Sequence, residues 1–128
     1  MRFTAQYPLD DVAGSPAWAR GDAIGTFARV AEDAGYDAVA FTDHPAPPRA
    51  WLEGGGHAAL DPFVALTACA AHTARLRLMT FLAIVPYRNP FMLAKSAASV
   101  HLLSGGRLVL GVGGNMFKLA GSVIVFGV

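Results

Sequence analysis

The chain has 128 residues, enough for one domain, and 54% of them are hydrophobic while only 15% are charged. Because this is more apolar than an ordinary free-standing domain, the chain must bury both faces of a sheet or leave an apolar surface for a partner. Ten basic and nine acidic residues are scattered singly for a net charge of +1, so no basic cluster exists that could bind nucleic acid.

The first two elements follow from the spacing of apolar residues. Residues 2–7 predict a strand, which Pro8 ends. A helix is expected from about Arg20 to Ala34, because apolar residues recur there at the i, i+3, i+4 and i+7 spacing of one helical face. Gly35 then supplies the left-handed position that ends many helices.

A second strand, loop and helix follow at once. Residues 36–42 form a short apolar run typical of a buried strand, and the loop 43–60 contains three prolines and three consecutive glycines. Asp61 and Pro62 predict the start of the next helix, since Asp is a favoured N-cap and Pro loses no hydrogen bond in the first turn. That helix leads into residues 75–85, which predict a third strand.

The last predicted unit repeats this pattern. Asn89 and Pro90 begin a third helix, the Ser-Gly-Gly run 104–106 ends it, and residues 107–114 predict a fourth strand. The resulting order is β-α-β-α-β-α-β, and the strands show the near-continuous apolar runs of strands buried on both faces. This predicts a parallel α/β sheet, either doubly wound or the first part of a (β/α)8 barrel.

Polar residues at the end of strand 36–42 are the candidate functional residues. From residue type alone, Asp43 and His44 could be two metal ligands, a catalytic acid/base pair or the polar mouth of a loop. A catalytic metal needs about three protein ligands, and no HxH or HExxH spacing occurs, so no metal is expected. Trp51 could close over a substrate or follow a rigid surface course, and Arg88 could bind an anion or form a surface salt bridge.

Cysteine content and hydropathy indicate the cellular compartment in which the protein is expected. Cys69 is the only cysteine, which excludes an internal disulfide, and its apolar neighbours predict a buried small residue rather than a reactive thiol. The first residues lack the basic and apolar regions of a signal peptide, and no run approaches the ~20 apolar residues of a membrane span. A soluble, cytoplasmic protein that does not bind membranes is expected.

Two blocks of the sequence resemble a known family. "GYDAVAFTDHPAPP" (35–48) and "LMTFLAIVPYRNPFMLAKSAASVHLLSGGRLVLGVGG" (78–114), with their spacing, are similar to the amino-terminal half of the luciferase-like monooxygenase family. The resemblance covers about residues 1–114 and is strongest to the branch that uses the deazaflavin coenzyme F420. It implies a partial (β/α)8 TIM barrel of about four βα units, with a flavin-like ring at the carboxyl ends of the strands.

The resemblance also implies site residues. His44 would handle a proton or stabilise charge during hydride transfer, with Asp43 beside it as a second catalytic residue. Family members often have a non-proline cis peptide bond backing the ring, usually with a small residue first, where this chain has Phe81. The implied cofactor-binding residues are Asp43, His44, Phe81, Leu82, Gly113 and Gly114.

The carboxyl-terminal segment departs from the family. The family usually has glycine where this chain has Asn115, and a polar helix follows there, whereas residues 115–128 form a divergent apolar tail or an extra strand. A truncated gene product would look like this. Whether the chain itself is an active enzyme is therefore left open.

Three functions are consistent with these features. The first expectation is an oxidoreductase that transfers hydride between a deazaflavin and a small organic substrate. The alternative within the family is a monooxygenase that uses FMN. The third is a non-catalytic remnant or a self-assembling half-barrel, because a half-barrel exposes two strand edges, so a homo-oligomer that covers them is expected.

Overall fold

The computed structural model describes residues 1–8, 16–114 and 124–127. In chain order its elements are β1 (Thr4–Gln6), the 3₁₀ helix η2 (Pro16–Ala19), α1 (Gly21–Asp33), β2 (Ala38–Phe41), α2 (Arg49–Glu53), α3 (Pro62–Ala70), β3 (Arg77–Thr80), β4 (Ala83–Ile84), the 3₁₀ helix η3 (Val85–Tyr87), α4 (Pro90–Leu103), β5 (Leu108–Gly113) and β6 (Ile124–Gly127). The rest of the tail, residues 115–123 and 128, lies outside the described residues, as does the departure at Asn115.

One sheet organises these elements. β1, β2, β3 and β5 lie side by side in that order and run parallel. The register places Ala40 opposite Gln6 on β1 and opposite Met79 on β3. β4 also pairs with β5 in parallel, and β6 pairs with β5 in antiparallel orientation. The predicted α/β class, with parallel strands joined by helices, is therefore confirmed.

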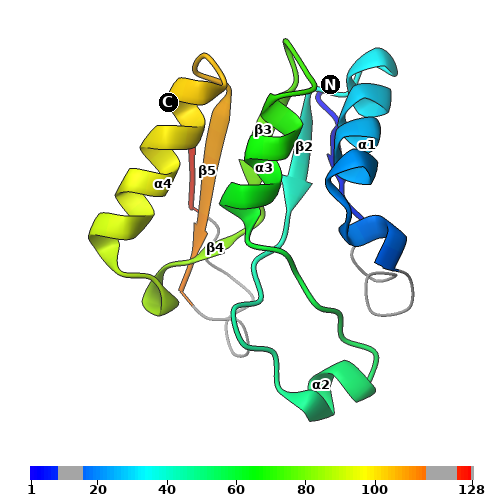
Figure 1. Ribbon diagram of the computed structural model, residues 1–128. Helices are drawn as coiled ribbons and strands as arrows, with labels where there is room; N and C mark the ends of the chain where they lie inside the picture. The colour runs from blue at the N-terminus through cyan, green and yellow to red at the C-terminus, as the bar shows by residue number, and fades with distance from the viewer. Residues whose placement is uncertain (9–15, 115–123, 128) are drawn as a thin grey trace.

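Three helices cover one face of this sheet, α1, α3 and α4 (Figure 1). The predicted helix starts are confirmed: Asp61 accepts hydrogen bonds from the backbone N–H of Phe63 (2.9 Å) and Val64 (3.2 Å). Asn89 caps α4 in the same way. Gly35, with φ of 83°, takes the left-handed conformation expected after α1. Local side-chain chemistry thus sets where these helices begin and end.

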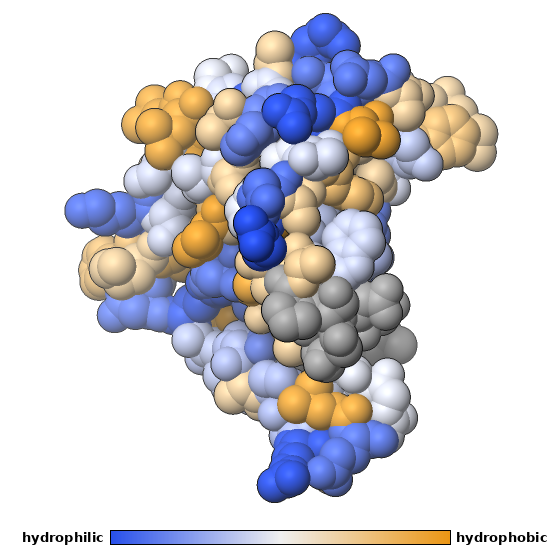
Figure 2. Space-filling view, turned by 45° about the vertical axis from the view of Figure 1, so that its right-hand side comes forward, coloured by the Kyte–Doolittle hydropathy of each residue, from blue (hydrophilic) through white to orange (hydrophobic). Residues whose placement is uncertain are grey.

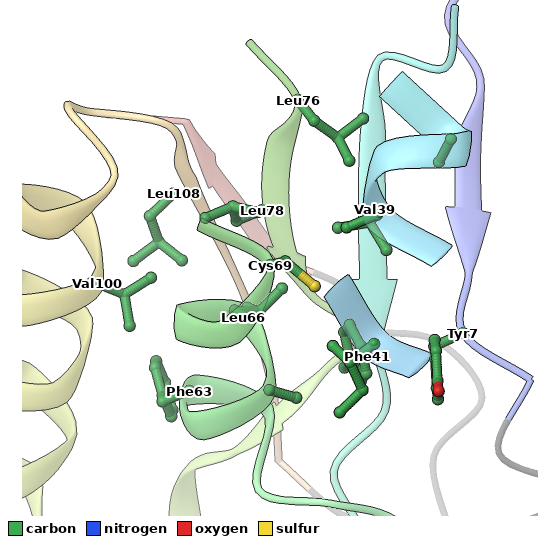
Figure 3. Close-up of a cluster of buried hydrophobic side chains, with 14 of the residues drawn as sticks. Tyr7, Val39, Phe41, Phe63, Leu66, Cys69, Leu76, Leu78, Val100 and Leu108 are labelled. Atoms are coloured by element: carbon green, nitrogen blue, oxygen red, sulfur yellow. The ribbon is translucent and has the colours of Figure 1, made fainter. Parts of the chain in front are cut away.

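The hydrophobic core lies between the helices and the sheet. Figure 3 shows Phe41, Leu66 and Leu78 directed into this space from β2, α3 and β3, and all three are fully buried. Cys69 lies in the same core, and burial raises the pKa of its thiol to about 12. The reactive thiolate is therefore nearly absent at neutral pH, which agrees with the predicted role of Cys69 as a buried small residue.

The predicted third strand, 75–85, is wrong as one continuous element. β3 and β4 both pair with β5, but a cis peptide bond between Phe81 and Leu82 separates them. At this interruption the Thr80 hydroxyl donates to the carbonyl oxygen of Gly111 (2.7 Å) and accepts from its N–H (2.8 Å). A run of apolar residues cannot reveal such a bulge, because the residues that support it lie on another strand.

The loop 43–60 is also not purely irregular, since it contains α2. This helix follows Pro48 and has no side-chain cap at its start. Trp51 of this helix packs against Gly56. The indole ring lies so close that a Cβ on Gly56 would collide with it. The prediction of an unbroken loop missed α2 because the expected capping signal is absent.

A carboxylate joins the end of α1 to the start of β3. Glu32 Oε1 accepts hydrogen bonds from the backbone N–H groups of Ala74 (3.1 Å), Arg75 (2.6 Å) and Leu76 (2.7 Å). Burial raises the pKa of Glu32, but these amide hydrogen bonds outweigh it, so the pKa lies below its ordinary value. The ionised carboxylate is therefore the form that the fold prefers.

Replacing Glu32 with Gln is expected to lower the free energy of unfolding at pH 7 by about 1–2 kcal/mol, because a charged acceptor is lost. Since the folded-state pKa is depressed, the advantage of the wild type should be complete above the ordinary pKa of 4.5 and vanish as the pH falls through the folded value. Urea unfolding of both proteins between pH 7 and pH 3 measures this. A difference independent of pH would contradict it.

Candidate functional site

The predicted site residues follow the carboxyl ends of neighbouring strands. Asp43 and His44 come after β2, Phe81 follows β3, and Gly113 ends β5. Because these strands are parallel, their carboxyl ends meet at one edge of the sheet, the lower edge in Figure 1, on the side of α2. This is the edge at which a (β/α)8 barrel carries its active site.

Asp43 is buried and hydrogen-bonded within the fold, with 4% of its surface exposed. Its Oδ2 accepts hydrogen bonds from the backbone N–H of Ile84 (2.9 Å) and from Nε (3.0 Å) and Nη2 (2.9 Å) of Arg88. Arg88 also donates from Nη1 to Asp61 (2.9 Å), and its guanidinium lies 5.1 Å from the centre of the Phe63 ring. These contacts tie the end of β4 and the start of α4 to the end of β2.

The environment of Arg88 settles which of its two expected roles the structure supports. It forms ion pairs with two carboxylates, those of Asp43 and Asp61, rather than presenting its guanidinium as an anion site. However, the expected surface position is wrong, because only 18% of the Arg88 side chain is exposed. Packing on Phe63 and burial of Asp43 draw the arginine inward.

His44 belongs to a cluster of rings. Its imidazole stacks on Trp51 with centroids 4.9 Å apart, and the ring of His57 is 4.6 Å away. Burial lowers the pKa of His44, the neighbouring His57 lowers it further, and the Asp43 carboxylate raises it by a smaller amount. Because the ordinary value is 6.5, His44 is a neutral imidazole at pH 7 and can accept a proton.

Phe81 lies on the face of the sheet that the three helices leave uncovered. Its side chain is 44% exposed and lines a hollow of about 180 Å³ together with Gln6, Ala40 and Met79. The cis peptide bond that the family resemblance implies is present between Phe81 and Leu82, although Phe81 is not a small residue. The backbone N–H of Phe81 donates to the carbonyl oxygen of Phe41 (2.7 Å), so Phe81 continues the pairing of β3 with β2.

The two glycines of the predicted site have different surroundings. A Cβ on Gly113 would stand 3.1 Å from Leu82 Cδ1, so the absence of a side chain gives Leu82 its space. Gly114 is exposed, and no atom of the described residues beyond its chain neighbours lies within 4 Å of the place of a Cβ. The nearby Gly111, which sequence reasoning did not select, has a closer approach than either, because a Cβ there would collide with the carbonyl oxygen of Thr80.

Two buried polar atoms at this edge have no hydrogen-bond partner among the described residues. They are the hydroxyl oxygen of Thr42 and Nδ1 of His44. Sequence reasoning missed Thr42, whose only signal is a polar residue at the last position of an apolar strand run. It also missed His57, which the chain brings to His44 through the fold of residues 45–56.

Other site classes find no support in residues 1–8, 16–114 and 124–127. Within these ranges, no three or more His, Cys, Asp or Glu side chains converge as ligands for a metal ion. No helix in the same ranges has the length and apolar character that crossing a bilayer requires.

A parallel sheet of βα units with polar side chains at the carboxyl ends of its strands is shared by doubly wound α/β folds and (β/α)8 barrels. The luciferase-like monooxygenase family matches residues 3–118. The chain therefore belongs to the luciferase-like monooxygenase family, which the sequence blocks predicted.

Individual relatives agree with this assignment. An F420-dependent glucose-6-phosphate dehydrogenase of Amycolatopsis mediterranei is 38% identical over 86 residues, which cover 65% of this chain and 24% of that protein. The crystal structure of the monooxygenase RslO1 from Streptomyces bottropensis has a TM-score of 0.71 and 28% identity, covering 91% of this chain and 34% of that one. The predicted barrel architecture is confirmed over the doubly wound alternative.

A further solved structure is similar in fold alone. The oxygenating constituent of 3,6-diketocamphane monooxygenase from Pseudomonas putida, in complex with FMN, has a TM-score of 0.73 at 20% identity. The match covers 91% of this chain and 30% of that one. The chain thus spans about a quarter to a third of the length of these three proteins.

Proposed function

We propose that this chain contributes to hydride transfer between the deazaflavin coenzyme F420 and a small organic substrate. The observation that carries the proposal is the neutral, half-buried imidazole of His44 at the carboxyl edge of a luciferase-like sheet. The F420-dependent relative supports the deazaflavin, while the FMN-bound structural neighbour keeps FMN as the alternative cofactor.

The residues at this edge fit a flat ring ligand. Phe81 is exposed on the uncovered face, the cis bond to Leu82 shapes the backbone beside it, and Gly113 and Gly114 offer backbone without side chains. We propose that these four residues hold the ring, and that His44 contacts its polar edge. When bound, the deazaflavin would supply or accept the hydride.

The chain's own residues would perform the proton chemistry. His44 is neutral at pH 7, so it can take a proton from a substrate hydroxyl or return one. Asp43 accepts three hydrogen bonds from Ile84 and Arg88, which keep the strand end in place. We therefore propose that Asp43 acts as a positioning residue for His44 rather than as a second proton carrier.

Direct binding tests the proposal. Purified chain is titrated with F420 and, separately, with FMN, and the absorbance and fluorescence of each cofactor are followed. Tighter binding of F420 supports the deazaflavin, and tighter binding of FMN favours the monooxygenase. Absence of binding of either cofactor at high micromolar concentration would sink the proposal for this chain.

Exposed apolar surface favours a second candidate, a homo-oligomeric assembly of half-barrels. A hollow of about 600 Å³ between η2 and α1 is lined in part by Trp18, Phe27 and Val30. Another, of about 350 Å³ beside α4, is lined in part by Leu102 and Leu110. On the face drawn in Figure 2, apolar residues also gather in separate patches among hydrophilic ones.

Self-association would bury such surface and cover the strand edges. Among the described strands, β1 has a partner on one side only, namely β2. Multi-angle light scattering distinguishes the two candidates. A well-folded monomer at all concentrations tested excludes the assembled half-barrel, whereas a dimer that binds no cofactor supports a non-catalytic assembly.

A further inference from the structure

Three consecutive residues after β2 lie in different surroundings. Oδ2 of Asp43 accepts hydrogen bonds from Ile84, at the end of β4, and from Arg88, just before α4. By contrast, the hydroxyl of Thr42 and Nδ1 of His44 are shielded from solvent and lack a partner among the described residues. The two residues that flank Asp43 therefore carry the unused hydrogen-bonding capacity at this strand end.

The strand register gives the position of Thr42. Phe41 belongs to the core under the helices, whereas Ala40 lines the hollow on the opposite, uncovered face. Because side chains alternate along a strand, Thr42 follows Ala40 onto the uncovered face. Phe41 pairs with Thr80, so Thr42 comes next to Phe81, whose exposed ring lines the same hollow.

Unpaired buried polar atoms are rare in folded proteins, and each one calls for an explanation. A threonine hydroxyl both donates and accepts, and a neutral imidazole has one donor and one acceptor nitrogen. Together Thr42 and His44 match a ring edge on which N–H and C=O groups alternate. The cyclic imide edge of a flavin or a deazaflavin has this pattern.

We propose that Thr42 is a ligand-orienting residue, whose hydroxyl hydrogen-bonds the imide edge of a flat cofactor ring beside Phe81, with His44 as its companion. This inference rests on the proposed function. Trp51 is stacked on His44, so a ring whose edge hydrogen-bonds to His44 comes close to the indole. Ligand binding therefore changes the fluorescence of Trp51.

Thr42→Val tests the hydroxyl alone, because valine keeps the shape of the side chain, and Thr42→Ser is the matched control that retains the hydroxyl. Without ligand, the thermal midpoint of Thr42→Val is expected to equal or exceed that of the wild type, since the hydroxyl has no hydrogen bond to any described residue. Its affinity for F420 and FMN is expected to fall about tenfold, as for the loss of one good hydrogen bond, while Thr42→Ser stays within about threefold.

The fluorescence readout uses a Trp18→Phe background, in which Trp51 is the one remaining tryptophan. A fluorescence change that saturates with the cofactor titration supports binding of the ring beside Trp51. If Thr42→Val lowers the thermal midpoint by several degrees, or binds both cofactors as tightly as the wild type, this inference fails alone. If the wild type binds neither cofactor, the proposed function fails and the inference fails with it.

Discussion

Replacing Arg88 with methionine is expected to lower the free energy of unfolding at pH 7 by about 3–5 kcal/mol, because a buried carboxylate loses its counter-charge. The side chain of Asp43 is only 3% exposed, and two of its three hydrogen bonds come from the Arg88 guanidinium. Methionine retains the packing of a long side chain on Phe63, so the loss reports charge rather than a cavity. Urea unfolding followed by far-UV circular dichroism measures it.

A surface pair in the same chain provides the control. Arg20 and Asp22 form an ion pair at 3.0 Å with side chains 70% and 68% exposed. Arg20→Met is expected to have a much smaller effect than Arg88→Met, since solvent screens exposed pairs. Equal small losses for the two variants would contradict a structural role for the buried pair. Adding Asp43→Asn to Arg88→Met should recover part of the stability, because the uncompensated charge is then removed.

Gly111→Ala is expected to cost about 3 kcal/mol or more, or to prevent folding. Its Cβ would collide with the carbonyl oxygen of Thr80, a backbone atom that cannot rotate away as a side chain can. The N–H and the carbonyl of Gly111 are both bonded to the Thr80 hydroxyl, so a shift of β5 would break both bonds. Soluble yield and urea unfolding report the effect.

Gly114→Ala is the matched control for this substitution. It adds the same methyl group three residues further on, where no atom of the described residues beyond the chain neighbours lies within 4 Å of the new Cβ. We expect a change within about 0.5 kcal/mol, as for most exposed positions. A tolerated Gly111→Ala would show that β3 and β5 can separate at the bulge.

The sequence alone predicted the elements whose signals are local. The caps at Asp61 and Asn89 accept hydrogen bonds from backbone N–H groups two and three residues further on. A stretch of four residues therefore contains each whole interaction. The left-handed Gly35 and the apolar runs of β2 and β5 are equally local. The family blocks then indicated the barrel and the edge on which the candidate site lies.

The tertiary structure decided what depends on distant residues. Asp43 and Arg88 are 45 positions apart, and Thr80 and Gly111 are 31 apart, so no spacing in the sequence announces either contact. The fold alone shows that Oδ2 of Asp43 is hydrogen-bonded and that the Thr42 hydroxyl has no partner among the described residues. Sequence patterns indicate which residues are able to form hydrogen bonds. The role of each polar group depends on its burial and on which partners compete for it, and both are set only when the strands lie side by side.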